Sequence, residues 1–359
     1  MRIISCALLL FCFFSAKAQY NFSALDQWLK DNRDNFGGRA VLMIYKDGKI
    51  IYNKSYNHLT TRQRAARKFI ARRQGKDVSE ALKDFDENTQ QPIASCSKWL
   101  SAALVMTFVD EGKLKPDDSV GTYLPEMTAH GKGHITIAQC LAHLTGIKQE
   151  GIGESKDGAR EIRNFSRFKS MDESIAYIAG MPMEGEPGKT FHYGNAGLQI
   201  AAAVIEKISG KNFETLFQER IARPCDMKKT SFGSGVPLAA GGAKGTAIDY
   251  MHFLQMILNR GVYNGKQVLG EESIAVMQRN HIADARMVYS PAAGLNWGYG
   301  FGEWVMKEGA VSSPGLFGSF PWVDNEKGYC GMLFSVNLKN RQRKQLYTSL
   351  LKVVEGCLE

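Results

Sequence analysis

The chain has 359 residues, of which 44% are apolar and 23% are charged, and its formal net charge is +9. This composition is typical of a globular protein, and it excludes disordered, collagen-like and coiled-coil chains. A chain of this length can bury a large core without disulfide or metal crosslinks, either as one domain with an insertion or as two domains.

The first eighteen residues differ from the rest of the chain. Arg2 is followed by an apolar run over residues 3–14 and then by an Ala-Lys-Ala sequence that ends at Ala18. These features are typical of a secretory signal peptide, and we expect cleavage after Ala18. The apolar run is shorter than the roughly 20 residues of a membrane span and no later run is long enough, so we expect no transmembrane segment. The predicted mature domain, 19–359, is therefore expected to be periplasmic or secreted.

Downstream of this segment, the sequence predicts a short helix over 23–32 and then a β-hairpin. Two runs rich in β-forming residues, 39–45 and 49–56, flank the tripeptide 46–48, which reads Lys-Asp-Gly. An Asp-Gly pair between two such runs favours a tight turn. The hairpin is followed by a basic stretch with a helical pattern over 60–83.

The basic stretch holds a concentrated positive charge. Without Arg2 and Lys17, the net charge of the predicted mature chain is +7. Seven clustered basic residues in this stretch equal that whole excess of positive charge. Such a patch can bind nucleic acid or another anionic surface. No RNA- or DNA-binding motif accompanies it, so we favour a solvated helical insertion and expect no nucleic-acid partner. The seven residues are Arg62, Arg64, Arg67, Lys68, Arg72, Arg73 and Lys76.

An apolar helix is predicted over 98–108. The sequence Trp-Leu-Ser-Ala-Ala-Leu-Val-Met-Thr-Phe leaves this helix without a polar face, and Gly112 favours its end. A helix that is apolar on all sides lies in the interior of a protein. We therefore expect this helix at the centre of the molecule.

Helical patterns dominate an inserted region that we place at about 116–270. Strand patterns return after about residue 295. The expected C-terminal elements are strands over 299–305, 315–323 and 329–336 and an amphipathic helix over 341–354. Strands from both chain ends that bracket helices predict an α+β fold, with one antiparallel sheet built from both ends.

Residues Ser95-Cys96-Ser97-Lys98 form an S-x-x-K motif at the start of the apolar helix. Residues three apart share a helix face, so the side chains of Ser95 and Lys98 can meet. A lysine in apolar surroundings loses its proton more readily, and it can then activate a serine nucleophile. Free N–H groups at a helix N-terminus can help to bind an oxyanion. The simpler alternative is a capping serine with a surface lysine, because the motif also arises by chance.

A second cluster, His192-Tyr193-Gly194-Asn195, precedes a predicted helix that begins near Ala196. A tyrosine near a buried lysine can move protons between nucleophile, base and leaving group. An asparagine two residues further on can hydrogen-bond the lysine and a substrate carbonyl. On its own, Tyr-x-Asn is a common tripeptide, for which a structural turn is the simpler interpretation.

Together, the two clusters resemble the serine β-lactamase and penicillin-binding protein superfamily, on the branch of class C β-lactamases, DD-peptidases and related esterases. The resemblance covers about 39–354. It rests on the nucleophile segment 92–98, on 136–147 (similar to TI..LL.HTSGL), on 187–195 (similar to PG..F.YSN) and on 223–227 (similar to PLGM). It implies the β-lactamase/transpeptidase-like fold, with the site between the sheet and the helical region.

The resemblance also implies roles for individual residues. Ser95 is the expected nucleophile, and Lys98 and Tyr193 are expected to move its proton. Asn195 is expected to bind Lys98 and the substrate. The N–H groups of Ser95 and Leu316 are expected to hold the oxyanion. No metal or organic cofactor is implied.

The third family element departs from its usual pattern. It is commonly Lys-Thr-Gly or His-x-Gly, whereas this chain has Ser313-Pro314-Gly315-Leu316. Gly315 keeps the close backbone approach, but Ser313 replaces the cation or imidazole that helps to hold a substrate carboxylate. A neutral hydroxyl binds a carboxylate less strongly, which disfavours β-lactam antibiotics as substrates. If they are nevertheless turned over efficiently, another group supplies the missing charge, and the arginines of the segment 62–76 are among the nearby candidates.

These expectations predict an exported serine hydrolase that acts through an acyl-enzyme on ester or amide bonds of a small-molecule or peptide-like substrate. Esterase or peptidase-like activity is the first interpretation, and a class C-like β-lactamase is the second. A third, of another class, is a non-hydrolytic penicillin- or peptide-binding protein that keeps the fold. The sequence leaves the substrate and the oligomeric state open.

Overall fold

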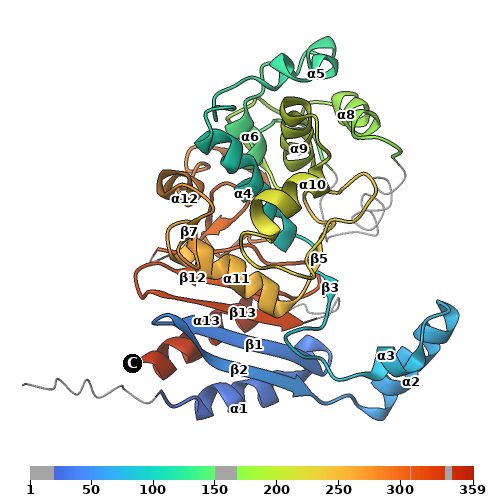
Figure 1. Ribbon diagram of the computed structural model, residues 1–359, viewed down its shortest axis with the longest axis vertical. Coiled ribbons are helices and arrows are strands. Elements are labelled where there is room, and N and C mark those ends of the chain that lie inside the picture. Colours follow the sequence, from blue (N-terminus) through green and yellow to red (C-terminus); the bar gives the residue numbers. More distant parts are fainter. Residues whose placement is uncertain (1–19, 150–167, 308, 336–341) are drawn as a thin grey trace, which may run out of the picture.

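The computed structural model describes residues 20–149, 168–307, 309–335 and 342–359. The predicted signal peptide, 1–18, lies outside the described residues. In the part of the chain that is described, no helix is both long and apolar enough to cross a membrane. The two ends of the described chain lie together at one end of the molecule, and a group of helices lies at the other (Figure 1).

Seven described strands form one antiparallel sheet in the order β2-β1-β13-β12-β11-β10-β9. Strand β1 pairs with β13, so that Ala40 lies opposite Ser335. The prediction of one antiparallel sheet built from both chain ends is confirmed. The strands are β1 (Arg39–Lys46), β2 (Lys49–Asn57), β9 (Gly298–Tyr299), β10 (Trp304–Val305), β11 (Ala310–Ser312), β12 (Phe320–Asp324) and β13 (Tyr329–Ser335).

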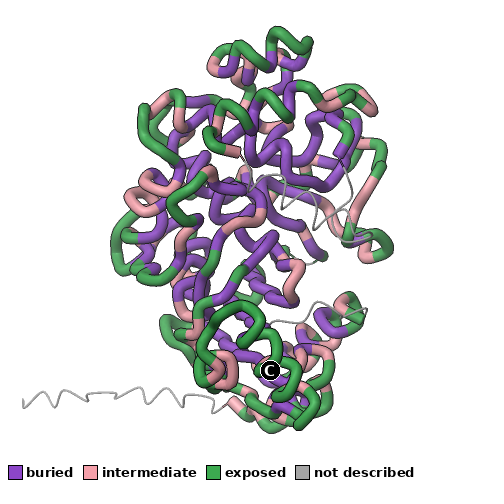
Figure 2. The backbone as a smooth tube through the Cα atoms, turned by 90° about the vertical axis from the view of Figure 1, so that its right-hand side faces the viewer, coloured by how far each residue is buried: buried purple, intermediate pink, exposed green. Residues whose placement is uncertain are grey.

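Two hydrophobic cores lie on opposite faces of this sheet. Successive residues of a strand point to opposite faces, so Val41 and Met43 of β1 enter the larger core and Leu42 enters the smaller one. The smaller core is closed by α1 (Ser23–Asp31) and α13 (Arg343–Leu358). Figure 2 shows buried backbone running through the sheet and through the helical part, with exposed segments at the rim.

The larger core is centred on α4 (Cys96–Asp110), of whose fifteen residues thirteen are buried. The predicted position of this apolar helix is confirmed. The other described helices of this part are α5 (Pro125–Ala129), α6 (Ile137–Leu141), α8 (Met171–Ala179), α9 (Ala196–Ser209), α10 (Phe213–Phe217) with a π-helical turn (Gln218–Ala222), α11 (Ala247–Leu258) and α12 (Glu271–Met277). Short strands accompany them: β3 (Gln91–Pro92), β4 (Thr190–His192), β5 (Lys244–Gly245), β6 (Val262–Tyr263), β7 (Lys266–Gln267) and β8 (Arg286–Tyr289).

Two of the predicted C-terminal strands were wrong in their extent. The run 299–305 is divided into β9 and β10 by a turn, in which Gly302 has a φ of +79°. A Cβ atom on Gly302 would lie 2.5 Å from the carbonyl oxygen of Lys98, so only glycine fits where this turn meets α4.

The run 315–323 is a loop before it becomes a strand. The N–H of Gly315 donates to the carbonyl oxygen of Ser319 over 2.8 Å, and Gly318 has a φ of +104°. These features form a turn, which delays the start of β12 to Phe320. The third family element therefore lies on the loop between β11 and β12, not within a strand.

Residues 58–91 leave the sheet after β2 and carry α2 (Thr61–Arg73) and α3 (Val78–Leu82), as the basic stretch predicted. Helix α2 begins with a capping box, in which the Thr60 hydroxyl accepts from the N–H of Gln63 and the Gln63 side chain accepts from the N–H of Thr60. Figure 1 shows α2 and α3 as a projection beside the sheet, away from the helical part.

Candidate active site

Ser95 lies at the N-terminal end of α4, directly after a strained residue. The preceding Ala94 has a φ of +47°, a left-handed conformation that is costly for a residue with a Cβ atom. Hydrogen bonds on both sides hold this conformation: Ile93 N–H donates to the Ala243 carbonyl, and Cys96 N–H donates to the Ile93 carbonyl. The Ser95 side chain makes no capping bond, and it lines a cavity. The strained turn therefore presents this hydroxyl to the cavity.

Lys98 is fully buried one helical turn after Ser95. Its Nζ lies 3.4 Å from the Ser95 Oγ, 3.3 Å from the Asn195 Oδ1 and 2.8 Å from the Ala240 carbonyl oxygen. It also lies 4.8 Å from the centre of the Tyr193 ring. The two sequence clusters thus meet in space, although nearly a hundred residues separate them in the chain.

Tyr193 is held by its backbone and by aromatic neighbours. It follows β4, which pairs in parallel with β8, and its N–H donates to the Tyr289 carbonyl. Its ring stacks on Trp304, with the ring centres 5.3 Å apart, and packs against Tyr299 and His143. Burial raises the pKa of the Tyr193 phenol, and a hydrogen bond with Ser95 offsets part of this shift. The phenol is therefore protonated at neutral pH and can pass on a proton while it accepts another.

Gln149 holds the backbone beside Asn195, a role that the sequence did not reveal. Its Oε1 accepts the N–H groups of Asn195 (2.6 Å) and Ala196 (2.9 Å), and its Nε2 donates to the His192 carbonyl. A Cβ atom on Gly194 would lie 1.9 Å from this Oε1. Gln149 thus fixes the turn that aims Asn195 at Lys98, and glycine is needed at position 194 for this contact.

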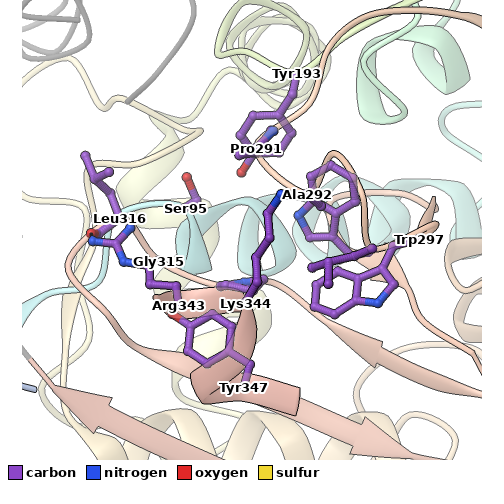
Figure 3. A pocket seen from close by; sticks show the side chains of 13 residues that line it. Ser95, Tyr193, Pro291, Ala292, Trp297, Gly315, Leu316, Arg343, Lys344 and Tyr347 are labelled. Atoms are coloured by element: carbon purple, nitrogen blue, oxygen red, sulfur yellow. Dashed lines mark hydrogen bonds between the residues drawn. The ribbon is translucent and has the colours of Figure 1, made fainter. Parts of the chain in front are cut away.

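The cavity beside Ser95 has a volume of about 120 Å³. In Figure 3, the side chains of Ser95 and Tyr193 point toward the same space from different elements. One wall is apolar and aromatic, and it comes from the chain between β8 and β10. Besides Ser95 and the residues of α13, the lining residues are Tyr193, Pro291, Ala292, Leu295, Trp297, Trp304, Pro314, Gly315 and Leu316.

The loop after β11 contributes backbone to the cavity, whereas Ser313 itself is directed elsewhere. The buried Ser313 hydroxyl lies 3.1 Å from the Ser95 carbonyl oxygen and 2.9 Å from the Gly302 carbonyl oxygen, and Ser313 is not among the lining residues. The Ser313 hydroxyl thus links the start of α4 to the turn between β9 and β10. The expected direct contact of Ser313 with substrate therefore has no support in this arrangement.

Gly315 and Leu316 do reach the cavity. A Cβ atom on Gly315 would lie 2.4 Å from the Ile93 carbonyl oxygen, so the loop can approach the turn before Ser95 only with glycine here. Within the described residues, neither the N–H of Ser95 nor that of Leu316 has a protein acceptor. Both amides thus remain available as donors at the two sides of the serine.

Two cations from the start of α13 also line the cavity. Arg343 donates to the Leu316 carbonyl, and Lys344 donates to the Ala293 carbonyl. Figure 3 shows Lys344 extending into the space between the aromatic wall and Ser95. The segment 62–76, one candidate source of this charge, does not line the cavity, and several of its residues line a separate hollow beside α2.

Burial shifts the pKa values of three further groups, Cys96, His143 and Glu303, toward their neutral forms. Burial raises the pKa of the Cys96 thiol, which excludes it as a nucleophile at neutral pH, and lowers the pKa of His143. Burial also raises the pKa of Glu303, and neither of its carboxyl oxygens has a partner in the described part of the chain. Over the described ranges, no group of three or more His, Cys, Asp or Glu side chains is placed to hold a metal ion.

The family model described as Beta-lactamase matches residues 26–355. This match includes the serine at the helix start, the lysine and tyrosine beside it, and the loop after β11. The chain belongs to the β-lactamase family. Its fold is the β-lactamase/transpeptidase-like fold, as the resemblance implied.

Two solved structures and one relative are similar to this chain. A solved structure titled "putative beta-lactamase from Bacteroides dorei DSM 17855" has 25% sequence identity and a TM-score of 0.74, covering 94% of this chain and 99% of that one. The structure of EstCE1, described as a hydrolase with promiscuous acyltransferase activity, has 17% identity and a TM-score of 0.72, covering 92% of this chain and 97% of that one. A "Putative D-alanyl-D-alanine carboxypeptidase" from Escherichia coli K12 is 26% identical over 235 residues, which are 63% of this chain and 50% of the relative. The chain thus spans about half the length of that relative.

Proposed function

We propose that this protein is an exported serine hydrolase that forms an acyl-enzyme with ester or amide substrates. The observation that carries the proposal is that Ser95 and Tyr193 line one cavity, while the buried Lys98 contacts Ser95, Asn195 and the Tyr193 ring. Each member is buried, and each is placed by a different local device: the strained turn, the apolar helix, the paired strands and the Gln149 contact. Backbone strain such as that at Ala94 is typical of functional sites, and here it exposes the hydroxyl of the next residue.

In the first step, the Ser95 oxygen attacks the carbonyl carbon of the substrate. Lys98 in its neutral form donates two N–H groups, to Asn195 and to the Ala240 carbonyl, and its lone pair accepts the serine proton. Tyr193 relays that proton to the leaving group as the tetrahedral intermediate collapses. The bond to the leaving alcohol or amine breaks, and the acyl group stays on Ser95.

The developing oxyanion is held by the amides of Ser95 and Leu316. Donors fixed before the reaction stabilise this charge better than water does, because they need no reorientation. In the second step, a water molecule gives its proton to the Lys98–Tyr193 pair and attacks the acyl carbon. Ser95 then recovers its proton, and the carboxylic acid leaves.

A neutral ester or a peptide-like amide with an apolar acyl group suits this site best. The aromatic wall of Trp297 and Trp304 offers apolar contact area for such a group. The names of two relatives, a hydrolase with acyltransferase activity and a carboxypeptidase, support the same class.

The second candidate is a class C-like β-lactamase, or another hydrolase of carboxylate-bearing substrates. Arg343 and Lys344 favour it, because they place cations at the cavity where the third family element lacks one. A cation and a carboxylate form a charge-assisted hydrogen bond, which is stronger than a neutral one. This candidate predicts that nitrocefin turnover depends on Arg343 and not on Ser313.

The test compares p-nitrophenyl butyrate with nitrocefin for the wild type, Ser95→Ala and Arg343→Gln. We expect faster hydrolysis of the ester, loss of both activities in Ser95→Ala, and loss of nitrocefin turnover alone in Arg343→Gln. Faster turnover of nitrocefin than of the ester would favour the second candidate. Stoichiometric acylation without turnover of either substrate would contradict a hydrolase and favour a penicillin- or peptide-binding protein.

A further inference from the structure

The basic helix α2 has no part in the proposed chemistry. It carries Arg62, Arg72 and Arg73 on its exposed surface, and the chain contains no acidic residue between Asp47 and Asp77. Among the ion pairs of the described residues, none involves a basic residue of 62–76. The basic residues of this helix therefore form no ion pair within the described residues.

Like charges are crowded at the base of the projection. Arg39 donates to the carbonyls of Ala81 and Lys83, and its pKa is lowered to about 10, first by burial and then by Arg67. Burial also lowers the pKa of Arg67 itself. Asp84 offsets part of this repulsion, and an anionic partner on this side of the molecule would offset more of it.

The same helix exposes large apolar side chains. Phe69 is 65% exposed and Ile70 is 51% exposed, the two highest values among the large apolar residues of the described chain. They are adjacent on α2, and Arg62, Arg72 and Arg73 are exposed on the same helix. Only Ala71 of α2 is buried, so the helix is an outward projection and not a cover for the core.

We propose that α2 binds the surface of an anionic phospholipid bilayer, with its arginines at the headgroups and Phe69 and Ile70 inserted among them. A bilayer explains both features, because its surface attracts basic residues and its boundary with the acyl chains accepts apolar ones. A nucleic acid would also use the charge, but an apolar side chain enters its base stack only by unstacking bases, which costs free energy that the bilayer boundary does not require. The predicted export would bring the helix to a membrane face. The inference is independent of the proposed reaction.

The test measures flotation with vesicles of phosphatidylcholine alone and of phosphatidylcholine with one third phosphatidylglycerol. All proteins carry the same N-terminus, so that any contribution of residues 1–18 cancels. We expect binding to the anionic vesicles only, and at least about tenfold weaker binding for the triple variant Arg62→Glu/Arg72→Glu/Arg73→Glu. Raising the salt from roughly 0.1 M to 0.5 M should weaken binding by the wild type.

The matched control reverses three exposed cations of the helical part, Lys115→Glu/Lys266→Glu/Arg279→Glu. Its net charge equals that of the α2 variant, and we expect it to bind like the wild type. Phe69→Ser/Ile70→Ser should lose binding severalfold with the charge intact. Circular dichroism and the thermal unfolding midpoint verify that each variant is folded.

Three results would overturn the inference. One is equal binding to neutral and anionic vesicles, and another is equal loss of binding in the α2 and control variants. The third is tighter binding to a single-stranded oligonucleotide than to anionic vesicles, unaffected by the Phe69/Ile70 change, which would assign α2 to a nucleic acid.

Discussion

Helices α4 and α2 are of similar length and lie close together in the sequence, yet their surroundings are opposite. Thirteen residues of α4 are buried, whereas α2 buries only Ala71. The single cation of α4, Lys98, contacts three oxygen atoms, whereas the cations of α2 other than Arg67 are exposed. Burial thus decides what a basic side chain can do. A buried lysine can give up its proton and act as a base, but an exposed arginine keeps its charge and can only attract anions.

The largest effect on activity is expected for Lys98→Arg, which tests whether the buried Lys98 acts as a base. Arginine keeps the charge but does not lose its proton in a protein, so it cannot accept the proton of Ser95. We expect a loss of kcat on the order of 10³-fold in p-nitrophenyl ester hydrolysis.

A matched control is Lys132→Arg, which changes another buried lysine, bound to the Ala179 carbonyl away from the cavity. The control should keep most activity. Retained activity in Lys98→Arg would mean that the lysine acts only through its charge, as we expect for the arginines of α2.

The next effect is expected for Tyr193→Phe. The ring would still stack on Trp304, but the hydroxyl that bonds Ser95 would be lost. We expect kcat to fall about 10²-fold with little change in KM, because the group acts on the proton and not on substrate affinity. Since the pKa of Tyr193 is raised, the wild-type profile should show no tyrosine ionisation between pH 6 and about 10. A KM effect without a kcat effect would assign Tyr193 to binding.

The sequence predicted the parts of this site that depend on local patterns. The all-apolar helix, the Ser95–Lys98 spacing and the Asp-Gly hairpin each follow from neighbouring residues, and the structure has all three. Side-chain chemistry allowed a hydrogen bond between Lys98 and Asn195, but only the family resemblance made it an expectation, because the two residues are distant in the chain.

Contacts set by tertiary packing were not predictable. Gln149 and Arg343 reach the site from separate segments without any motif, and Ser313 turns its hydroxyl to two backbone carbonyls. The loop at 315–319 was predicted as part of a strand, because the composition of 315–323 favours β-structure. The turn at Gly318 was therefore not predicted.

Burial also decides what an acidic side chain does to folding stability, and thermal unfolding measures this for Glu303. Glu303 lies in the interior with a raised pKa, so the folded state favours its neutral form. As pH rises through the unfolded-state pKa near 4.3, ionisation stabilises the unfolded chain, and folding stability falls. We expect Glu303→Gln to raise the thermal midpoint by roughly 2 °C or more at pH 8, with the difference vanishing near pH 4. A lower midpoint at pH 8 would show that the carboxylate is charged and paired.

The smallest effect is expected from the α2 charge reversal on catalysis. Arg62→Glu/Arg72→Glu/Arg73→Glu changes exposed residues that do not line the cavity beside Ser95. Its kcat/KM for a neutral ester should differ from the wild type by less than about twofold. A large loss would mean that α2 takes part in substrate binding, and that the two helices do not have separate roles.

The most direct test of the central claim is intact-mass analysis after labelling with a fluorophosphonate. The wild type, Ser95→Ala and Ser97→Ala would be compared, because Ser97 is a buried serine on the same helix whose hydroxyl accepts the N–H of Ala243. The account predicts one added label per chain in the wild type and in Ser97→Ala, and none in Ser95→Ala. A label that persists in Ser95→Ala would contradict the assignment of Ser95 as the nucleophile.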